Sequence, residues 1–146
     1  MSHARKQIRD AVVTLVTGLS TTGSSVFSFR EHAFAASDLP CLNVLDNPDG
    51  ENAELVTMSS GTNMRTLMLR VEGRAKSSAT LETVLDAIAS EVEAVLDGAK
   101  PAGAKLCRIA GTSKDISVAG AVPHGLVNID FEITYNTARG APDTIV

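Results

Sequence analysis

The sequence is poor in aromatic residues and has no excess of positive charge. It contains no Trp, one Tyr and four Phe, so aromatic residues make up 3% of the chain. Proteins that bind single-stranded nucleic acid stack bases on aromatic side chains beside basic residues, and this chain offers little of either. Its 13 Lys and Arg against 17 Asp and Glu give a net charge of −4, which opposes affinity for a phosphate backbone. We therefore expect no specific binding to DNA, although a protein that only encloses DNA is not excluded.

Cysteine and histidine are few and scattered. Cys41 and Cys107 lack the paired spacing of a zinc site, which favours two reduced thiols acting as small apolar side chains. His3, His32 and His124 lie far apart and none belongs to an HExxH motif, which favours solvated loop positions over metal ligands or a catalytic base. We expect neither a metal nor a cofactor.

Long apolar runs are also missing. Arg5, Lys6 and Arg9 before "AVVTLVTGL" imitate a signal peptide, but Asp10 interrupts the pattern and the apolar residues repeat at helical spacing. No stretch approaches the roughly 18 apolar residues of a membrane span. The segment therefore predicts an amphipathic helix, and we expect the protein in the cytoplasm with no membrane contact.

Motifs of catalysis are absent from the sequence. It contains no GxSxG, no GxxxxGK[ST] and no GxGxxG that follows a strand and opens a helix. Ser59 and Ser60 in "MSSGTNM" stand beside a glycine, which is ordinary turn composition. We therefore predict that the protein is not an enzyme. The alternative of a small-molecule-binding or hydrolytic domain would need His32, His124 and a cysteine to meet in one cleft.

The remaining composition is that of one globular domain, which we take to span residues 1–146. The spacing of apolar residues predicts a helix over residues 4–17, ending at Gly18. A second helix is expected between a cap at Ser78 or Thr80 and Gly98, with one apolar stripe. The stripe consists of Leu81, Val84, Leu85, Ile88, Val92, Val95 and Leu96.

Strands are indicated by alternation of apolar and polar residues. The clearest run is "RTLMLRVEGRA", with Leu67, Leu69 and Val71 facing inward. The other predicted strands are "VFSF" with Phe27 and Phe29 on one face, "LPCLNVL", "KLCRIAG" with "DISVAG" as one broken strand or two short ones, and residues 127–135. This order predicts an α+β fold, a mainly antiparallel sheet with both helices on one face. Its other face would stay partly open.

Three outward residues of the clearest strand, Arg70, Glu72 and Arg74, are candidates for contact with a neighbouring subunit. Plain solvated surface is the alternative for them. The C-terminal "NTARGAPDTIV" has no apolar periodicity, so ordering it on its own subunit would cost backbone entropy for little gain. Residues 138–146 are therefore a candidate extended arm, with a frayed end as the alternative. The candidate interface residues in this region are Thr137, Arg139, Gly140 and Pro142.

The segment "DNPDGENAE" predicts a solvated hairpin tip, because Asn-Pro and Asp-Gly are strong turn signals. A calcium loop is disfavoured, since no helix flanks it and the twelfth position carries no Glu. Its acidic residues are Asp46, Asp49, Glu51 and Glu54.

Several segments, taken in order, resemble the tail-terminator family of long-tailed bacteriophages, which includes the minor tail protein U group of lambda-like phages. The most specific are the Thr-Thr-Gly loop leading to Val26 and Phe27, the entry Leu39-Pro40, and the closing "YNTARGAPD". The resemblance extends over nearly the whole chain. It implies a hexameric ring that caps the tail tube at the end nearest the head, stops its polymerisation and joins the head.

The partners implied by this resemblance are further copies of the chain, the tail tube protein and the head–tail connector protein. Another head–tail joining or completion protein is the alternative within the same class. The resemblance also places the protein in the virion tail after assembly in the host cytoplasm. DNA would pass through the ring without specific binding. The acidic segment of residues 46–54, or the acidic side of the second helix, is a candidate lining that would keep DNA mobile by repulsion.

Overall fold

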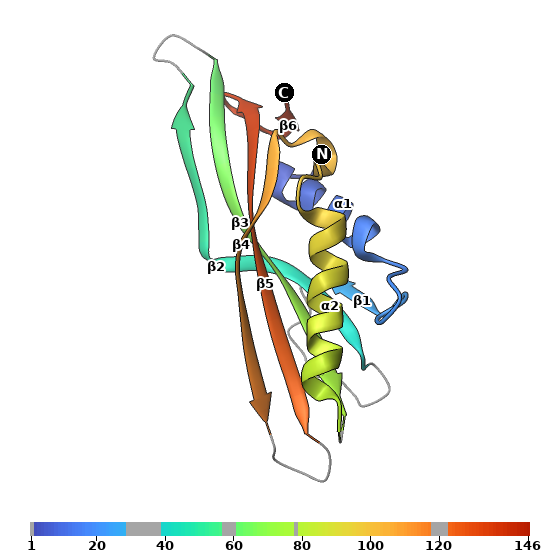
Figure 1. Ribbon diagram of the computed structural model, residues 1–146. Helices are drawn as coiled ribbons and strands as arrows, with labels where there is room; N and C mark the ends of the chain where they lie inside the picture. The colour runs from blue at the N-terminus through green and yellow to red at the C-terminus, as the bar shows by residue number, and fades with distance from the viewer. Residues whose placement is uncertain (1, 29–38, 57–60, 78, 118–122) are drawn as a thin grey trace.

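The computed structural model describes residues 2–28, 39–56, 61–77, 79–117 and 123–146, without the side chains of residues 47–49. Two helices, a short 3-10 helix and six strands follow one another along the chain (Figure 1). In order they are α1 (Ala4–Val16), β1 (Val26–Ser28), β2 (Cys41–Leu55), β3 (Thr62–Lys76), α2 (Leu81–Leu96), η2 (Pro101–Gly103), β4 (Leu106–Ser117), β5 (His124–Ala138) and β6 (Ala141–Ile145). None of the described helices is long and apolar enough to cross a membrane.

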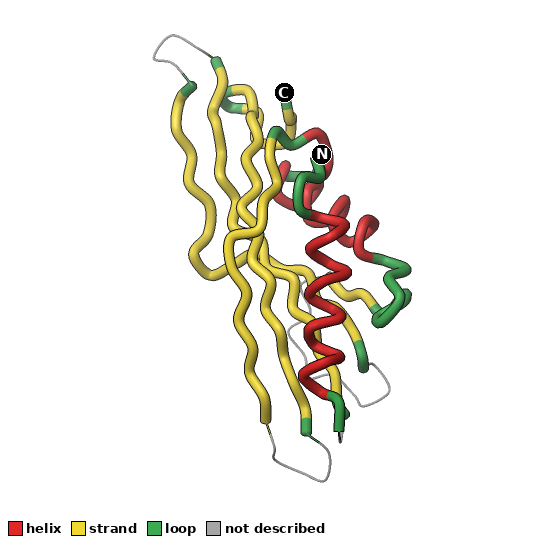
Figure 2. Tube along the Cα trace, in the orientation of Figure 1, coloured by secondary structure: helices red, strands yellow, loops and turns green. Residues whose placement is uncertain are grey.

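The six strands form one sheet in the order β1-β2-β3-β5-β4, and β6 pairs with β5 beside this path. The pairing is antiparallel throughout, except that β1 runs parallel to β2. Both helices lie on one side of the sheet (Figures 1 and 2). The predicted α+β class and its mainly antiparallel sheet are confirmed.

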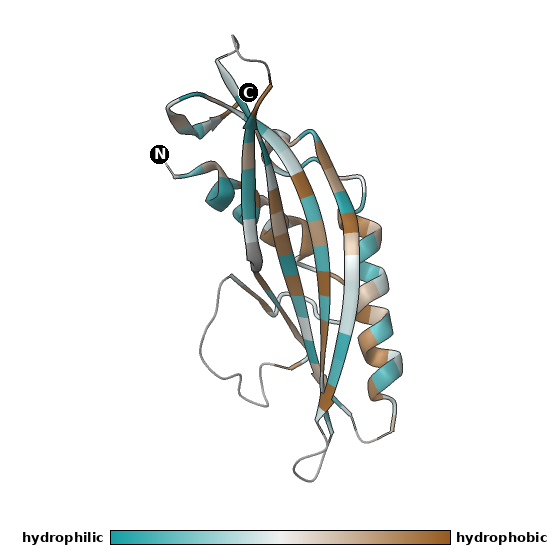
Figure 3. Cartoon of the chain, turned by 90° about the vertical axis from the view of Figure 1, so that its left-hand side faces the viewer, coloured by the Kyte–Doolittle hydropathy of each residue, from teal (hydrophilic) through white to brown (hydrophobic). Residues whose placement is uncertain are grey.

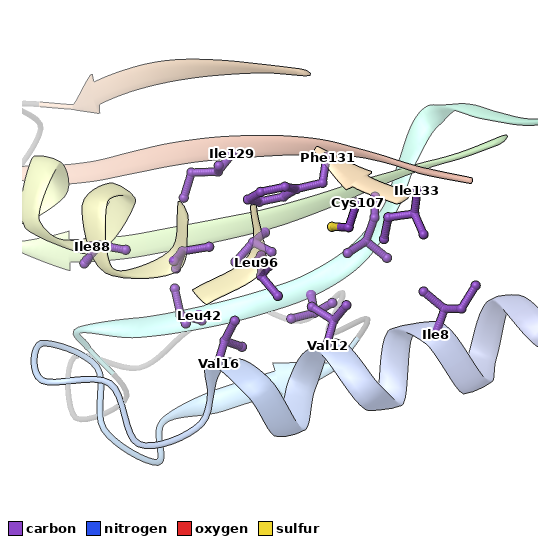
Figure 4. Close-up of a cluster of buried hydrophobic side chains, with 14 of the residues drawn as sticks. Ile8, Val12, Val16, Leu42, Ile88, Leu96, Cys107, Ile129, Phe131 and Ile133 are labelled. Atoms are coloured by element: carbon purple, nitrogen blue, oxygen red, sulfur yellow. The ribbon is translucent and has the colours of Figure 1, made fainter. Parts of the chain in front are cut away.

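The core lies between the helices and the sheet, and it is mostly aliphatic (Figure 4). The buried residues of α1 are Ala4, Ile8, Val12 and Val16, and those of α2 are Leu81, Leu85, Ile88, Val92 and Leu96. Their spacing of three or four residues places them on one face of each helix. On β5 every second residue from Gly125 to Thr137 is buried, in the period of two that a half-buried strand requires. The inward residues predicted for β3 are confirmed, and the strand predicted at residues 127–135 lies within β5.

The ends of the helices follow the predicted glycines closely. Gly18 and Gly98 have φ of 91° and 87°, the left-handed conformation that glycine adopts without strain. Thr80 precedes α2 but its side chain makes no capping hydrogen bond, while Ser78 lies outside the described residues. At α1 the cap is His3, whose Nδ1 accepts a hydrogen bond from Arg5 N–H at 3.1 Å. His3 is therefore a capping residue and not the solvated loop residue that we expected.

The acidic turn predicted at residues 46–54 is wrong, because these residues belong to strand β2. Asp46 pairs with Leu69 of β3 and Glu51 pairs with Leu67, so five steps along β2 span two steps along β3. The extra residues form a bulge in which Gly50 has φ of 77°. The turn signals at Asn47-Pro48 and Asp49-Gly50 mark this bulge. Pairing with β3 continues on both sides, so the strand bends instead of reversing.

Two further segments differ from expectation. Residues 106–117 form one strand, β4, in which a bulge between Ile109 and Gly111 replaces the expected break. The last residues form β6, which turns back at Gly140, with φ of 73°, and pairs with β5 of the same subunit. Val146 N–H donates to Asn136 O at 2.9 Å, and the Gln7 side chain of α1 donates to Asp143 O at 2.7 Å. Backbone pairing thus orders an end that lacks apolar periodicity. The expected shared face of Phe27 and Phe29 cannot be placed, because residue 29 lies outside the described part.

Candidate interaction surfaces

The described residues contain no cluster of three or more His, Cys, Asp or Glu that could hold a metal. Cys41 and Cys107 are both buried free thiols, and burial raises the pKa of Cys107 to about 11. His124 borders a hollow of about 180 Å³ together with Arg74 and Asp115, and neither cysteine lines it. His32 lies outside the described residues. Ser117 lines the same hollow as Asp115 and His124, and the cleft of histidines with a cysteine that a hydrolytic domain would need is not formed among the described residues.

A polar cluster centred on Glu51 joins α1 to the sheet on the helix side. The Glu51 side chain is 6% exposed, and its Oε1 accepts hydrogen bonds from Arg5 at 3.2 Å and Arg65 at 3.1 Å. Its Oε2 accepts a hydrogen bond from the Tyr135 hydroxyl at 2.5 Å. Burial, and secondly this hydrogen bond, raise the pKa of Tyr135 well above its ordinary value of 10.0. Arg65 Nε also donates to Thr137 Oγ1 at 2.9 Å.

The ion pairs in and near this cluster show how much free charge the acidic segment of residues 46–54 presents. Glu51 is occupied by two arginines, and Asp46 forms an ion pair with Arg9 of α1 at 3.6 Å. Glu54 is exposed, and the side chain of Asp49 is outside the described part. Two of the four carboxylates therefore connect the sheet to α1 and present little free charge.

The sheet face opposite the helices carries Arg70, Glu72 and Arg74, and it is turned toward the viewer in Figure 3. Arg70 donates two hydrogen bonds to Asp130, at 2.8 and 3.2 Å. Arg74 pairs with Glu72 at 3.3 Å. Arg108 of β4 pairs with Glu132 on the same face. We call this surface the open face; three arginines on it are each matched by a carboxylate.

The other candidate interface residues lie away from the open face. Thr137 is fully buried on the helix side, where it accepts the hydrogen bond from Arg65. Arg139 and Gly140 form the exposed β5–β6 turn, and Pro142 is exposed in β6. Arg139 N–H donates to Gly61 O at 2.7 Å, so this turn lies beside the start of β3. The structure thus buries Thr137 and places the other candidates on two separate surfaces.

The acidic side of α2 is partly neutralised. Asp86 and Glu82 both lie near the ammonium group of Lys114 on β4, and hydrogen bonding to Asp86 raises the pKa of Lys114. Glu91 accepts hydrogen bonds from the backbone and the hydroxyl of Thr21, at 2.9 and 2.5 Å. Neither segment proposed as a lumen lining is a uniformly acidic surface.

Two edges of the sheet are exposed in the described part of the structure. The sequence patterns did not predict them. Every residue from Gly111 to Ser117 on β4 is exposed, and so is every residue from Asn52 to Leu55 on β2. A groove of about 520 Å³ runs between α2 and the β4 edge. Its lining residues are Asp86, Ala89, Ser90, Glu93, Ala94 and Thr112. In the sequence, the available signal for these two edges was the apolar residues Leu55, Val56 and Ile116, which the structure leaves exposed.

Comparison with known proteins identifies no family. No family model matches the sequence, and no curated protein matches it. Among solved structures, one chain of the virion of the native gene transfer agent (GTA) particle has a similar fold, with a TM-score of 0.58. The two chains are 11% identical over 92% of this chain and 96% of that chain. The likeness shows a shared fold over almost the full length of both.

Proposed function

We propose that this protein is a structural component of a phage-like particle, and more narrowly a tail terminator that caps the tail tube as a hexameric ring. The observation that carries the proposal is the fold shared with a GTA virion chain over 92% of this chain. The ordered resemblance of the sequence to tail terminators supports it independently.

Termination of a tube requires two unlike surfaces on one ring. A tube grows because each ring offers the next one a matching end, so growth stops when a subunit matches the tube on one side only. The chain provides unlike surfaces: a charge-balanced open face, a helical face, and a β5–β6 turn beside the start of β3. We assign the turn, with Arg139, Gly140 and Pro142, to contact with the tube or the connector.

The proposal is tested by mass and by tube length. Six copies of the 15.2 kDa chain give a ring of about 91 kDa, which sedimentation or native mass spectrometry would detect alone or with tail tubes. Tails assembled without this protein should be overlong. Tubes of normal length that lack heads would instead support a joining protein of the same class. Tails that are normal in length and carry heads would rule out both roles.

Deleting residues 140–146 tests whether the β5–β6 turn contributes to contact with the tube or the connector. The deletion removes β6 and its hydrogen bond with Gln7 but leaves the buried core residues of β5 in place. We expect the truncated protein to fold and to fail in tail joining. Normal joining by this variant would remove the turn from the interface and leave the terminator proposal standing.

A further inference from the structure

Strand β4 is the last strand of the main sheet path, and only half of its outer edge is covered. Around Cys107 and Ile109 the turn after α2 occupies the edge. Gly98 N–H donates to Cys107 O at 2.8 Å, and Ile109 N–H donates to Asp97 Oδ1 at 3.1 Å. From Gly111 to Ser117 the strand is exposed, and no strand in the described part pairs with its outer side. An exposed strand edge of this kind can pair with another strand.

The space beside this edge is bounded by α2. The groove between α2 and β4 has Ala89, Ser90 and Ala94 on the helix wall and Thr112 at its base. Two carboxylates lie on its rim: Asp86, which is paired with Lys114 of β4, and Glu93. A strand added next to β4 would therefore lie below the edge of α2. Its side chains facing the helix would have to be uncharged and no larger than this groove allows.

The same chain carries a segment with these properties on the opposite side of the sheet. β1 pairs only with Leu42–Val44 of β2, so the distal part of β2, Asn52–Leu55, is exposed and hydrogen-bonded only to β3 among the described strands. Ala53 pairs with Arg65 and Leu55 with Asn63, which places both on the helix side of the sheet. Glu54 points to the opposite face. Leu55 is an exposed large apolar residue, with 38% of its surface accessible.

We propose that Asn52–Leu55 of one copy pairs with Gly111–Ser117 of the next copy, with Ala53 and Leu55 entering the groove below α2. The proposal rests on the terminator function only in requiring a ring of identical copies, and it names the contact that closes the ring. Ile116 is 46% exposed and lies on the same face as Leu55, so the contact would bury both. An interface between unlike surfaces of one chain is the type that generates rings.

Strand direction and face are both compatible with this contact. Successive antiparallel pairs give β2 and β5 one direction and β3 and β4 the other. β2 of a copy turned about a ring axis would therefore meet β4 in the antiparallel sense, with the helices of both copies on the same side. The two segments lie at different heights along the sheet. Through the strand pairing, Asn52 is level with Thr134 of β5 and Gly111 is level with Asp130, so the nearest ends of the segments are four residues apart along β5. Strands of closed sheets are tilted from the axis, so adjacent edges need not be level.

Two single variants test the contact from its two sides. Ala53→Glu would place a charged carboxylate in the groove beside Glu93, whereas Ser90→Trp fills the groove. Both positions are exposed, so both variants should keep the wild-type melting temperature. Leu15→Glu is the matched control, since Leu15 is an exposed apolar residue of α1 outside both edges. In sedimentation velocity up to millimolar protein, wild type and control should form the ring, and each variant should remain a monomer of 15.2 kDa.

Mixing the two variants gives the decisive result. The Ala53→Glu variant keeps an intact groove, and the Ser90→Trp variant keeps an intact β2 edge. The β2 edge of the second can therefore bind the groove of the first. No further copy can add, because the two remaining surfaces of this pair both carry a substitution. We expect one-to-one dimers of about 30 kDa, twice the mass of the chain. Rings formed by either variant alone, a mixture without dimers, or wild type that is monomeric at every concentration would each overturn the proposed contact. Rings that form as expected but leave tail tubes overlong would contradict the terminator function and support the contact.

Discussion

At the scale of single residues, Glu51 is the side chain on which the junction between α1 and the sheet depends. We predict that Glu51→Ala lowers the free energy of unfolding by about 3 kcal/mol, because it leaves Arg65 and the Tyr135 hydroxyl without their buried acceptor. Urea denaturation would measure the change. Glu54→Ala is the control, since this exposed carboxylate should contribute less than about 0.5 kcal/mol. Equal effects of the two substitutions would contradict the structural role of Glu51.

Cys107 gives a prediction on alkaline pH. Its folded-state pKa is raised from 9.0 to about 11, so the unfolded chain loses the thiol proton first and the free energy of unfolding falls as pH rises above 9. At about 1.4 kcal/mol per pKa unit, the loss approaches 2–3 kcal/mol near pH 11. Comparing wild type with Cys107→Ala by urea denaturation at pH 8–10 isolates this thiol before Tyr135 contributes. The variant should show the shallower decline, and parallel declines would be evidence against it.

The inward residues of the strands were predictable from the sequence, whereas the role of Glu51 was not. Leu67, Leu69 and Val71 alternate without interruption, so the period of two alone assigns their face. In β2 the core-facing residues are Leu42, Val44 and Asp46 before the bulge, and Glu51 and Ala53 after it. The bulge changes the parity of the strand. A reading without the bulge turns Glu51 to the opposite face, because register is decided by pairing with β3 and not by local pattern.

At the scale of elements, α2 lies against β3 and β5 at two glycines. A Cβ on Gly73 would lie 2.6 Å from Ile88 Cγ2, and one on Gly125 would lie 2.7 Å from Leu85 Cδ1. We predict that Gly73→Ala destabilises the protein by about 1–3 kcal/mol, because the added methyl group overpacks the interface between α2 and the sheet. Gly111→Ala is the control, as its Cβ would meet no atom within 4 Å. Thermal unfolding should separate the two variants, and a neutral Gly73→Ala would show that α2 can shift at low cost.

Helices and strands differ in how far their limits could be predicted. The stripe of α2 and its terminal Gly98 are local signals, and they placed the helix closely. The extents of β2 and β6 depend on partners distant in sequence: β3 continues to pair beyond the bulge, and β5 pairs with the C-terminal residues. The turn signals in "DNPDGENAE" were recognised, whereas Arg139-Gly140 in "ARGAP" was not interpreted as a turn. They could not reveal whether the chain reverses, bends or turns back onto its own sheet.

At the scale of the whole molecule, the sheet separates a helical side from an open face of different character (Figure 3). The helical side contains the core and the cluster around Glu51. The open face carries ion pairs between neighbouring strands, in which the carboxylates of Asp130 and Glu132 match Arg70 and Arg108. Charge compensation of this kind leaves no array of free cations to hold a phosphate backbone. Under the proposed terminator function, such a surface would suit the wall of a channel through which DNA passes.

The last prediction follows from that balance. In fluorescence anisotropy at low salt, wild type should not bind duplex DNA, whereas Asp130→Asn with Glu132→Gln should bind it, because the carboxylates beside Arg70 and Arg108 are gone. Two phosphate contacts predict a slope of log affinity against log salt of about −2. Glu82→Gln with Glu93→Gln, both on α2, changes the net charge equally outside the open face and should leave binding undetectable. Binding by this control as strong as by the first pair would attribute the effect to net charge, and tight binding by wild type would exclude the open face as a surface along which DNA slides.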